Sequence, residues 1–500
     1  MTRDDQRLER FLCIAAACVP AALYVIYVWH YSFNLPFGDD WTKMPLVVAA
    51  LRNHIDFGQV WDQHTEARLV VPNLVFVIVG RPIRFNIQVI VLVGASSLIA
   101  SYFVLLRLAR DYVARPPGWL LILVLGVVWF SLVDTGNSLW AFQLAWYLVI
   151  FFLMAMLYFL LAWPYRRRVG LALATLAAVC GSFSMVQGFL LWPVGVLCIA
   201  WSFERTRTRV LALGVWIGAA AVTAGTYFFH YELGKGCTEG THCSLDAPLR
   251  DPVHYGKFFA ALVGYVVPKV GPFGRDAAGL HQVIGLLLLA GAAIVVVQSL
   301  REWRSRDRPP LVLAIVLFAL LFDLTLMITR GGGRVVLAAQ SRFTMPNIML
   351  VAAFVLFAWA HPPRWTGEGD RTRRDYVQIA AAAALGLFVL LLAVFTTRTG
   401  IEEGRSWHRI QVTEARVLVN GRDIPRPTSH CYLTTFVTNG SRRSRSALIP
   451  VLRNVAAARR RKLYVFQKDR LETYRKLGPP EVPFVCQLPS ATNIVPRARG

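Results

Sequence analysis

Long apolar runs constrain the fold of this chain more than any other feature of its sequence. A helix needs about 20 predominantly apolar residues to cross about 30 Å of hydrocarbon. Eleven runs of roughly this kind are present, at 11–33, 87–106, 119–134, 144–163, 169–186, 188–202, 210–229, 280–300, 311–329, 344–360 and 376–396. Because 56% of the 500 residues are hydrophobic and only 16% are charged, an ordinary soluble domain is excluded. The sequence predicts a mainly α, polytopic transmembrane helix bundle of about eleven spans.

Arginine clusters at the ends of these runs predict how the chain is oriented. They are Arg3, Arg7 and Arg10 before the first run, Arg107, Arg110 and Arg115 after the second, Arg166, Arg167 and Arg168 after the fourth, Arg205, Arg207 and Arg209 after the sixth, and the basic segments 301–308 and 364–374. Loops rich in positive charge stay on the cytoplasmic side. We therefore expect the N-terminus inside and residues 397–500 outside. The first run has no small-residue cleavage site near its end, so we expect it to be a retained span and not a signal peptide.

One further apolar stretch, 256–272, has the length of a span but carries Lys257, Pro268 and Lys269. The arginine pattern keeps both later basic segments on the cytoplasmic side only if this stretch does not cross the membrane. We therefore expect a re-entrant or surface-lying helix on the outer side.

The formal net charge of +24 does not indicate a nucleic-acid partner, because the arginines gather at span ends and in the tail. Anionic membrane lipids account for such a distribution. No zinc-finger spacing, Walker loop or dinucleotide-binding fingerprint is present, and the segment RGGGR at 330–334 does not follow a strand. Membrane lipids are the expected partners, and the expected location is the bacterial inner membrane.

Four cysteines fall outside the predicted spans, all on the predicted outer side. Cys237 and Cys243 share one loop, and Cys431 and Cys486 share the tail. Disulfides belong to oxidising compartments, so these four residues are disulfide candidates. Their connectivity stays open at this point.

The first predicted outer loop, 34–86, is dense in charged and titratable residues. It contains the segments FGDDW at 37–41 and HTEAR at 64–68, which contribute Asp39, Asp40, His64, Glu66 and Arg68. If 61–71 is helical, Trp61, His64 and Arg68 share one face. A solvated amphipathic helix lying on the membrane is the alternative interpretation. The concentration of charge beside the bilayer favours a functional loop.

This pattern resembles the GT-C superfamily of integral-membrane glycosyltransferases. The resemblance rests on FGDDW in a first outer loop, about a dozen spans and an outer C-terminal region, and the short segments GNSLWAFQLAW at 136–146, SMVQGFLLWPV at 184–194 and GGGRVVLAAQSRF at 331–343 are similar to membrane proteins of bacterial polysaccharide loci. It implies a transmembrane catalytic domain at 1–396 and transfer of a sugar from a polyprenyl-phosphate donor to a glycan or lipid-linked acceptor.

The resemblance also implies roles for the adjacent carboxylates. An acidic residue in the first outer loop acts as base on the acceptor hydroxyl, and a positioned carboxylate contributes on the order of 10² to 10⁴ in rate. Asp39 and Asp40 are the candidates, with Asp39 favoured by its position. For one of the two, capping a helix that begins near Trp41 is the structural alternative.

Arginine suits the lipid-phosphate leaving group because its planar fork binds phosphate oxygens and keeps its charge. The candidates are Arg68, Arg330, Arg334 and Arg342. Contact with outer-leaflet headgroups is the alternative.

The candidate substrate-binding residues are His64, Glu66, Asn137, Trp140, Gln143, Gln187 and Asp323. Tryptophans at these positions also fit an interfacial belt, and a divalent ion held by His54, His64 and the aspartates is an open alternative.

The basic tail at 397–500 predicts a small outer α/β module, with a helix at 446–462 and a strand at LYVFQ, 463–467.

Other functions remain open. A transporter or flippase of lipid-linked glycans needs ionisable residues at mid-membrane, which Asp323 alone supplies. An O-antigen ligase or polymerase would place its arginines in later loops, and a structural subunit of the cell envelope would need no catalytic group.

Overall fold

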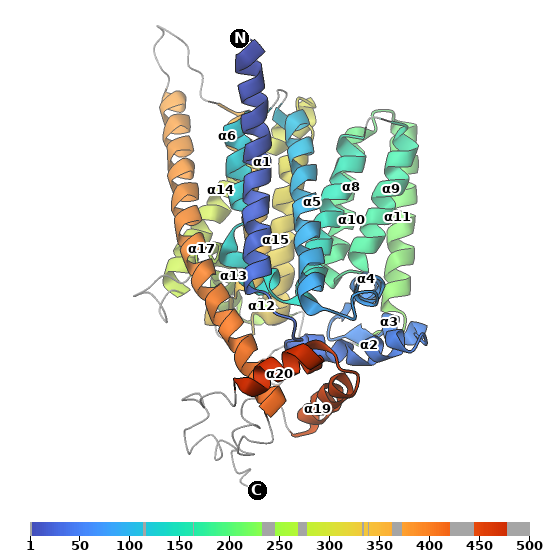
Figure 1. The fold of residues 1–500 in the computed structure, drawn as a ribbon. Coiled ribbons are helices and arrows are strands. Elements are labelled where there is room, and N and C mark those ends of the chain that lie inside the picture. Colours follow the sequence, from blue (N-terminus) through green and yellow to red (C-terminus); the bar gives the residue numbers. More distant parts are fainter. Residues whose placement is uncertain are drawn as a thin grey trace.

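The computed structural model describes residues 3–113, 117–163, 165–232, 246–268, 278–332, 335–338, 340–362, 373–420 and 445–477. In this part of the chain a helix forms at each of the eleven predicted runs (Figure 1). They are α1 (Arg3–Tyr31), α5 (Ile87–Val113), α6 (Trp119–Trp129), α8 (Leu144–Leu161), α9 (Arg167–Ser182), α10 (Leu191–Ser202), α11 (Thr206–Phe228), α14 (Ala278–Ser305), α15 (Leu311–Arg330), α16 (Met345–Ala360) and α17 (Arg373–Asn420).

Eight helical segments of the described chain are long and apolar enough to cross a membrane. The prediction of a mainly α, multi-pass membrane protein is confirmed to this extent, and the number of eleven spans stays a prediction. The helices α8 and α15 are largely buried inside the bundle, whereas α11, α14 and α17 are its most exposed long helices. Their exposed side chains include Val222, Leu287 and Leu390, which is the composition expected of helices that face lipid.

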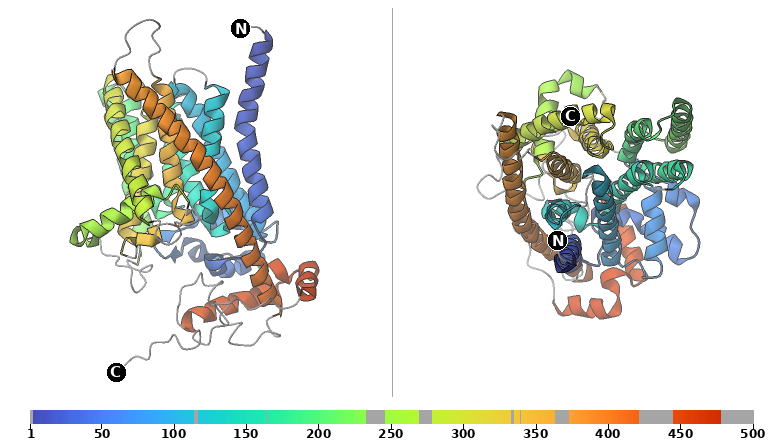
Figure 2. Two further views of the ribbon diagram at one scale, coloured as in Figure 1. Left: turned by 90° about the vertical axis from the view of Figure 1, so that its left-hand side faces the viewer. Right: turned by 90° about the horizontal axis from the view of Figure 1, so that it is seen from above.

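The arginine-rich ends of the helices lie at one end of the bundle, together with the start of α1 (Figures 1 and 2). The first loop and the last helices lie at the opposite end, called the outer end below. The short helix α13 (Pro252–Gly264) also lies there. Its 13 residues span about 20 Å, too little to cross the hydrocarbon. The re-entrant or surface-lying placement of 256–272 stays a prediction. Residues 269–272 of that stretch lie outside the described residues.

Close backbone contact holds α13 against α14. A Cβ on Gly264 would lie 1.8 Å from the carbonyl oxygen of His281, and a Cβ on Gly285 would lie 1.8 Å from that of Ala260. Only glycine fits at these two positions, because any side chain would overlap the facing backbone. This contact fixes α13 beside the outer end of the bundle.

Short elements fill the connections at the outer end. They are η1 (Gly38–Lys43), α2 (Met44–Leu51), α3 (Phe57–Trp61), β1 (Gln63–His64), β2 (Ala67–Arg68), α4 (Val70–Gly80), η2 (Leu132–Asp134), α7 (Thr135–Ser138), η3 (Ala141–Gln143), η4 (Val186–Leu190), α12 (Ala247–Arg250), η6 (Val335–Ala338) and η7 (Ser341–Phe343).

A helix over 61–71, the condition under which Trp61, His64 and Arg68 would share a face, does not form, because residues 63–68 form a β-hairpin. Strands β1 and β2 pair antiparallel, with His64 opposite Ala67 and Gln63 opposite Arg68. Thr65 makes the tight turn with a φ of 51°. Since cross-strand partners share a face of a hairpin, His64 and Arg68 lie on opposite faces and not together as a helix would place them.

The described part of the C-terminal region is helical, so the predicted strand at 463–467 is also wrong. Helix α19 (Arg445–Arg460) confirms the predicted helix, and η9 (Tyr464–Phe466) connects it to α20 (Lys468–Lys476). The apolar residues of 463–466 are buried, and Tyr464 contacts Met44 and Trp41 of the first loop, which explains their composition without a strand. Helix α17 also continues unbroken past the predicted domain boundary at residue 397.

The C-terminal helices hold the first loop in place. The Asn454 side-chain amide donates to the carbonyl of Trp41 at 2.8 Å, and the Tyr464 hydroxyl lies 3.6 Å from the sulfur of Met44. Trp41 is fully buried beneath them. This packing links α19 and η9 to the loop that carries both aspartates of FGDDW.

We predict that Ser305 lies in the cytoplasm and Ser446 outside it. A reporter that is active only in the cytoplasm should therefore work after Ser305, and one that is active only outside it should work after Ser446. Ser305 ends α14 at the arginine-rich end of the bundle, and Ser446 lies in α19 at the outer end. Parallel fusions to alkaline phosphatase and to green fluorescent protein measure both cases. The same result at both positions would contradict this orientation.

Candidate active site

Charged residues from the first loop and from the end of α15 meet at the outer end of the bundle. Glu66, in the hairpin turn, forms an ion pair with Arg330, the last residue of α15. Asp39 Oδ2 lies 3.9 Å from His64 Nε2. Burial and the nearby Arg330 lower the pKa of the Arg342 guanidinium, whereas Asp39 and Glu66 act to raise it. Five residues predicted from sequence therefore share one electrostatic neighbourhood.

The two aspartates of FGDDW have different surroundings. The Asp39 side chain is 45% exposed. Asp40 is 4% exposed, and its carboxylate accepts the Phe37 backbone N–H at 3.1 Å, which fixes the first turn of η1. Burial raises the pKa of Asp40 to about 8, and the adjacent Asp39 adds to the rise. This geometry fits a structural role for Asp40 and leaves Asp39 accessible to a substrate.

Lys43 and His64 complete the polar surroundings of Asp39. The Lys43 ammonium donates to Asn73 Oδ1 at 2.7 Å and lies 5.4 Å from the centre of the Phe142 ring. Burial lowers the pKa of Lys43 to about 8. Burial, with a smaller effect from Lys43, lowers the pKa of His64 below its ordinary 6.5. At neutral pH the His64 imidazole is therefore uncharged and does not neutralise Asp39.

Burial of Asp40 should make stability depend on pH. Its pKa is about 8 in the folded protein and 3.8 ordinarily, so its stabilising contribution is complete below about pH 4 and is lost as the pH rises towards 8. We predict that Asp40→Asn, whose amide oxygen can still accept the Phe37 N–H, will flatten the fall in thermal stability between pH 5 and pH 8. Melting temperatures measured in detergent across this range test the prediction, and an identical slope in wild type and variant would contradict it.

An aromatic cleft of about 430 Å³ opens beside this charged cluster. Its lining residues come from the first loop, the 135–140 turn, the C-terminal end of α13, the 340–342 segment and α17, and they are Phe37, Thr135, Gly136, Trp140, Tyr265, Gln340, Ser341, Arg342, Glu403, Ser406, Trp407 and Ile410. Arg342 belongs to both the cleft and the charged cluster. Aromatic faces, a few polar groups, the Arg342 guanidinium and the Glu403 carboxylate thus line one cleft, a lining typical of small-molecule sites.

Contacts between rings connect the cleft to His64. Phe37 packs against Trp407 and Trp140, with ring centroids 4.6 and 5.5 Å apart, and Trp140 packs against Phe142 at 5.9 Å. Phe142 in turn lies 4.8 Å from the His64 ring. The Trp140 indole donates to the Phe37 carbonyl at 2.9 Å, which fixes this wall of the cleft. Of the predicted substrate-binding residues, Trp140 thus has a place on the cleft surface.

Helix α17 forms the far wall because it approaches the bundle closely at Gly400. A Cβ there would lie 2.2 Å from the Leu132 Cβ, and the Gly400 carbonyl accepts the Tyr27 hydroxyl at 2.9 Å. Sequence reasoning missed the contribution of Glu403 and Trp407, because these residues follow the apolar run 376–396 and were assigned to the tail. The helical pattern of this run continues into these residues, and that continuation was the sequence signal that could have identified them.

The guanidinium of Arg68 is hydrogen-bonded to the protein backbone. The residue is 3% exposed, and its guanidinium donates to the carbonyl oxygens of Trp61, Tyr227, Phe229 and His230 at 2.6 to 3.0 Å. It joins the hairpin to the end of α11 on the face away from His64. The structure gives Arg68 a fixed structural function, and it is not part of the donor site proposed below.

We predict that Arg68→Ala will destabilise the protein by about 2–4 kcal/mol, because one buried and three partly buried carbonyl groups lose a charged donor. Thermal unfolding in detergent measures this effect. If Arg68→Ala kept wild-type stability but used the donor poorly, the result would contradict the structural role and support a phosphate-binding role for Arg68.

The other predicted substrate-binding residues lie in the interior. Gln143, Gln187 and Asp323 are each at most 3% exposed and do not line the cleft. Within the described chain, both carboxylate oxygens of Asp323 lack a hydrogen-bond partner. Asn137 is also buried, and its amide contacts the segment that carries Arg342.

Other candidates cannot be placed. Arg334, Cys237, Cys243, Cys431 and Cys486 lie outside the described residues. Among the residues that the structure describes, no group of three or more His, Cys, Asp or Glu side chains is arranged to hold a metal ion.

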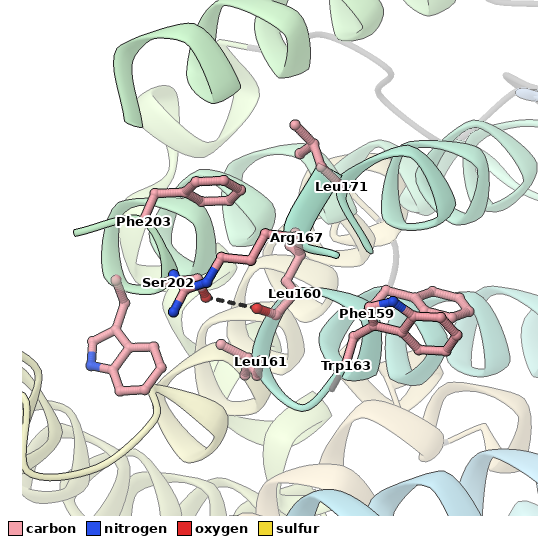
Figure 3. A pocket seen from close by; sticks show the side chains of 9 residues that line it. Phe159, Leu160, Leu161, Trp163, Arg167, Leu171, Ser202 and Phe203 are labelled. Atoms are coloured by element: carbon pink, nitrogen blue, oxygen red, sulfur yellow. Dashed lines mark hydrogen bonds between the residues drawn. The ribbon is translucent and has the colours of Figure 1, made fainter. Parts of the chain in front are cut away.

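A smaller hollow of about 80 Å³ lies at the arginine-rich end, between α8, α9 and α10 (Figure 3). Arg167 extends across it, and the Ser202 hydroxyl donates to the Leu160 carbonyl at 2.7 Å. It contains none of the predicted site residues and lies at the far end of the bundle from Asp39.

No protein-family model, curated protein or solved structure matches this chain. The function must therefore be inferred from the geometry and chemistry of the site itself.

Proposed function

We propose that the protein is a glycosyltransferase of the GT-C type. It transfers a sugar from a polyprenyl-phosphate donor to a hydroxyl of a glycan or lipid-linked acceptor, at the outer face of the bacterial inner membrane. The observation that supports this proposal most is that the partly exposed Asp39 carboxylate and Arg330 share an electrostatic neighbourhood with Arg342, which lines an aromatic cleft.

Asp39 serves as the base in this reaction. The acceptor oxygen attacks the anomeric carbon, the bond from that carbon to the phosphate oxygen breaks, and the hydroxyl proton passes to Asp39. A sugar hydroxyl is a weak nucleophile at neutral pH, so removal of its proton as the new bond forms contributes on the order of 10² to 10⁴ in rate. An uncharged His64 beside Asp39 leaves the carboxylate available for this task.

Arg342 stabilises the leaving group. Polyprenyl phosphate gains negative charge as the sugar departs, and a guanidinium in the cleft offsets this charge with charge-assisted hydrogen bonds. Arg342 also lies 5.1 Å from the Phe343 ring and donates to Gln340 Oε1 at 2.9 Å, two contacts that orient its side chain. Arg330 adds a second positive charge, which its ion pair with Glu66 partly balances.

One observation favours a second candidate, a transporter or flippase. The carboxylate of Asp323 lies inside the bundle without a hydrogen-bond partner in the described chain. Ionisable groups within the membrane often mark an ion or substrate pathway. A single such residue, away from the cleft, supports transport less well than the charged cluster supports transfer.

Mass spectrometry of surface glycans from a deletion strain tests the proposal. A transferase predicts a glycan that lacks one sugar, together with accumulation of the polyprenyl-phosphate sugar at the outer face. Accumulation of complete lipid-linked glycans at the cytoplasmic face would instead identify a flippase and contradict the proposal.

A further inference from the structure

A buried carboxylate, Asp134, lies directly behind the wall of the cleft. It ends η2 and is 2% exposed. Its Oδ1 accepts the Asn137 side-chain amide at 2.7 Å and lies 3.1 Å from the Thr344 hydroxyl, and its Oδ2 accepts the Tyr147 hydroxyl at 3.0 Å. The Asn137 amide and the Tyr147 hydroxyl thus both donate to one carboxylate. The Thr344 hydroxyl lies beside this carboxylate and also 2.7 Å from the Ser341 carbonyl. A buried polar group is stable in a protein only when its hydrogen bonds are satisfied in this way.

Asn137 connects this carboxylate to the segment that carries Arg342. Its side-chain amide nitrogen donates one hydrogen to Asp134 and the other to the Arg342 carbonyl at 2.9 Å. The adjacent Gly136 N–H donates to the Ser341 hydroxyl at 3.2 Å. A Cβ on Gly136 would lie 2.8 Å from that hydroxyl oxygen, so the two turns are in close contact. Two hydrogen bonds from the 136–137 turn therefore hold the segment 341–342, one at the Ser341 hydroxyl and one at the Arg342 carbonyl.

The same network reaches two transmembrane helices. The hydroxyl groups of Tyr24 on α1 and Tyr147 on α8 are 2.9 Å apart, and each lies 3.0 Å from the Ser138 hydroxyl. Because helices of the bundle anchor the network, the position of the 341–344 segment is coupled to the rigid part of the molecule. A loop residue on such a support keeps its place with little loss of entropy on binding.

We propose that Asp134 and Asn137 are positioning residues for Arg342 and set the affinity for the phosphate of the donor. The inference rests on the proposed function and deepens it, since it names what holds the phosphate-binding guanidinium in place. Neither residue contacts the reacting atoms in this account. Loss of the network should therefore weaken donor binding and leave the chemical step nearly unchanged.

Two variants with a matched partner test this inference. Thr344→Val removes, at nearly constant size, the hydroxyl that lies beside Asp134 and that also contacts the Ser341 carbonyl, whereas Thr344→Ser keeps both contacts. Asn137→Ala removes the link to Arg342. The control is Tyr102→Phe, which removes a buried hydroxyl that donates to the Ile122 carbonyl outside the network.

Binding of polyprenyl monophosphate to the purified proteins in detergent is the first measurement. We expect Thr344→Val and Asn137→Ala to raise its Kd on the order of tenfold, with Thr344→Ser and Tyr102→Phe close to wild type. In sugar transfer, the donor KM should rise similarly while kcat changes less than about twofold. Wild-type Kd values for both network variants would overturn the inference.

Limited trypsin digestion provides a readout that does not depend on catalysis. Release of the 341–344 segment should speed cleavage after Arg342 in Thr344→Val and Asn137→Ala, relative to Thr344→Ser. Equal cleavage rates in Thr344→Val and Thr344→Ser would contradict the positioning role even if no sugar were transferred. Absence of transfer by the wild-type protein would contradict the proposed function alone, so the two failures are distinguishable.

Discussion

Purified Asp39→Asn protein is expected to lose sugar-transfer turnover by a factor of about 10² or more while it still inserts and folds. Asparagine keeps the size and much of the hydrogen bonding of aspartate, but it cannot accept the proton of the acceptor hydroxyl. Asp39 is 45% exposed and lies at the surface of η1, so little packing is lost. The donor KM should stay near the wild-type value, because the base acts on the acceptor.

Two matched variants make this result specific. Asp40→Asn changes the adjacent carboxylate, which is buried and bonded to the Phe37 N–H, and it should keep most of the activity. Asp56→Asn changes an aspartate of the same loop that caps α3, a role that asparagine fills equally well. Both should be monodisperse and active. Near-normal turnover by Asp39→Asn would remove the catalytic role of this loop.

Arg342→Ala is expected to have the second large effect, a rise of the donor KM by roughly 10- to 100-fold. The alanine variant loses the cation that faces the cleft, whereas the ion pair of Glu66 with Arg330 remains. Arg342→Lys should restore only part of the affinity, because lysine keeps the charge but loses the planar fork that binds two phosphate oxygens.

The matched control is Arg107→Ala at the opposite end of the bundle. Arg107 forms an ion pair with Asp111 at 2.7 Å on the surface of α5, where its loss should affect neither KM nor kcat. Equal donor kinetics in wild type and Arg342→Ala would show that this arginine contacts lipid headgroups instead of the donor.

The hydropathy of the sequence predicted the location of the helices well, and the reason is physical. In hydrocarbon the backbone polar groups must pair within a segment, so a long apolar run has little choice but to form a helix. The arginine-rich helix ends lie together at one end of the bundle, and residues 256–264 belong to the short helix α13 at the other end. The orientation across the membrane stays a prediction.

The hairpin at 63–68 could not be predicted in the same way. Its pattern of alternating charged and small residues fits a helix face as well as a two-residue turn, and the choice depends on distant partners. Arg68 binds the carbonyls at the end of α11, and the Tyr231 hydroxyl donates to the Glu66 carbonyl at 2.9 Å. These contacts join segments about 160 positions apart in the sequence.

The importance of Asp134 was likewise hidden by its place in the sequence. It ends the apolar run 119–134, where an acidic residue looks like the boundary of a span. Only the fold shows that Asn137, Tyr147 and Thr344 converge on its carboxylate. Asn137 was predicted to bind sugar, whereas its amide hydrogens are used within the protein.

The most direct test of sugar transfer uses the purified protein with lipid extracted from the deletion strain, in which the unused donor should accumulate. Release of polyprenyl phosphate is measured together with transfer of the labelled sugar to an acceptor extract. The account predicts equal amounts of both products, formed by wild type and nearly absent with Asp39→Asn. The account would be contradicted if the folded wild-type protein released no polyprenyl phosphate and instead moved intact lipid-linked glycan across the bilayer of proteoliposomes.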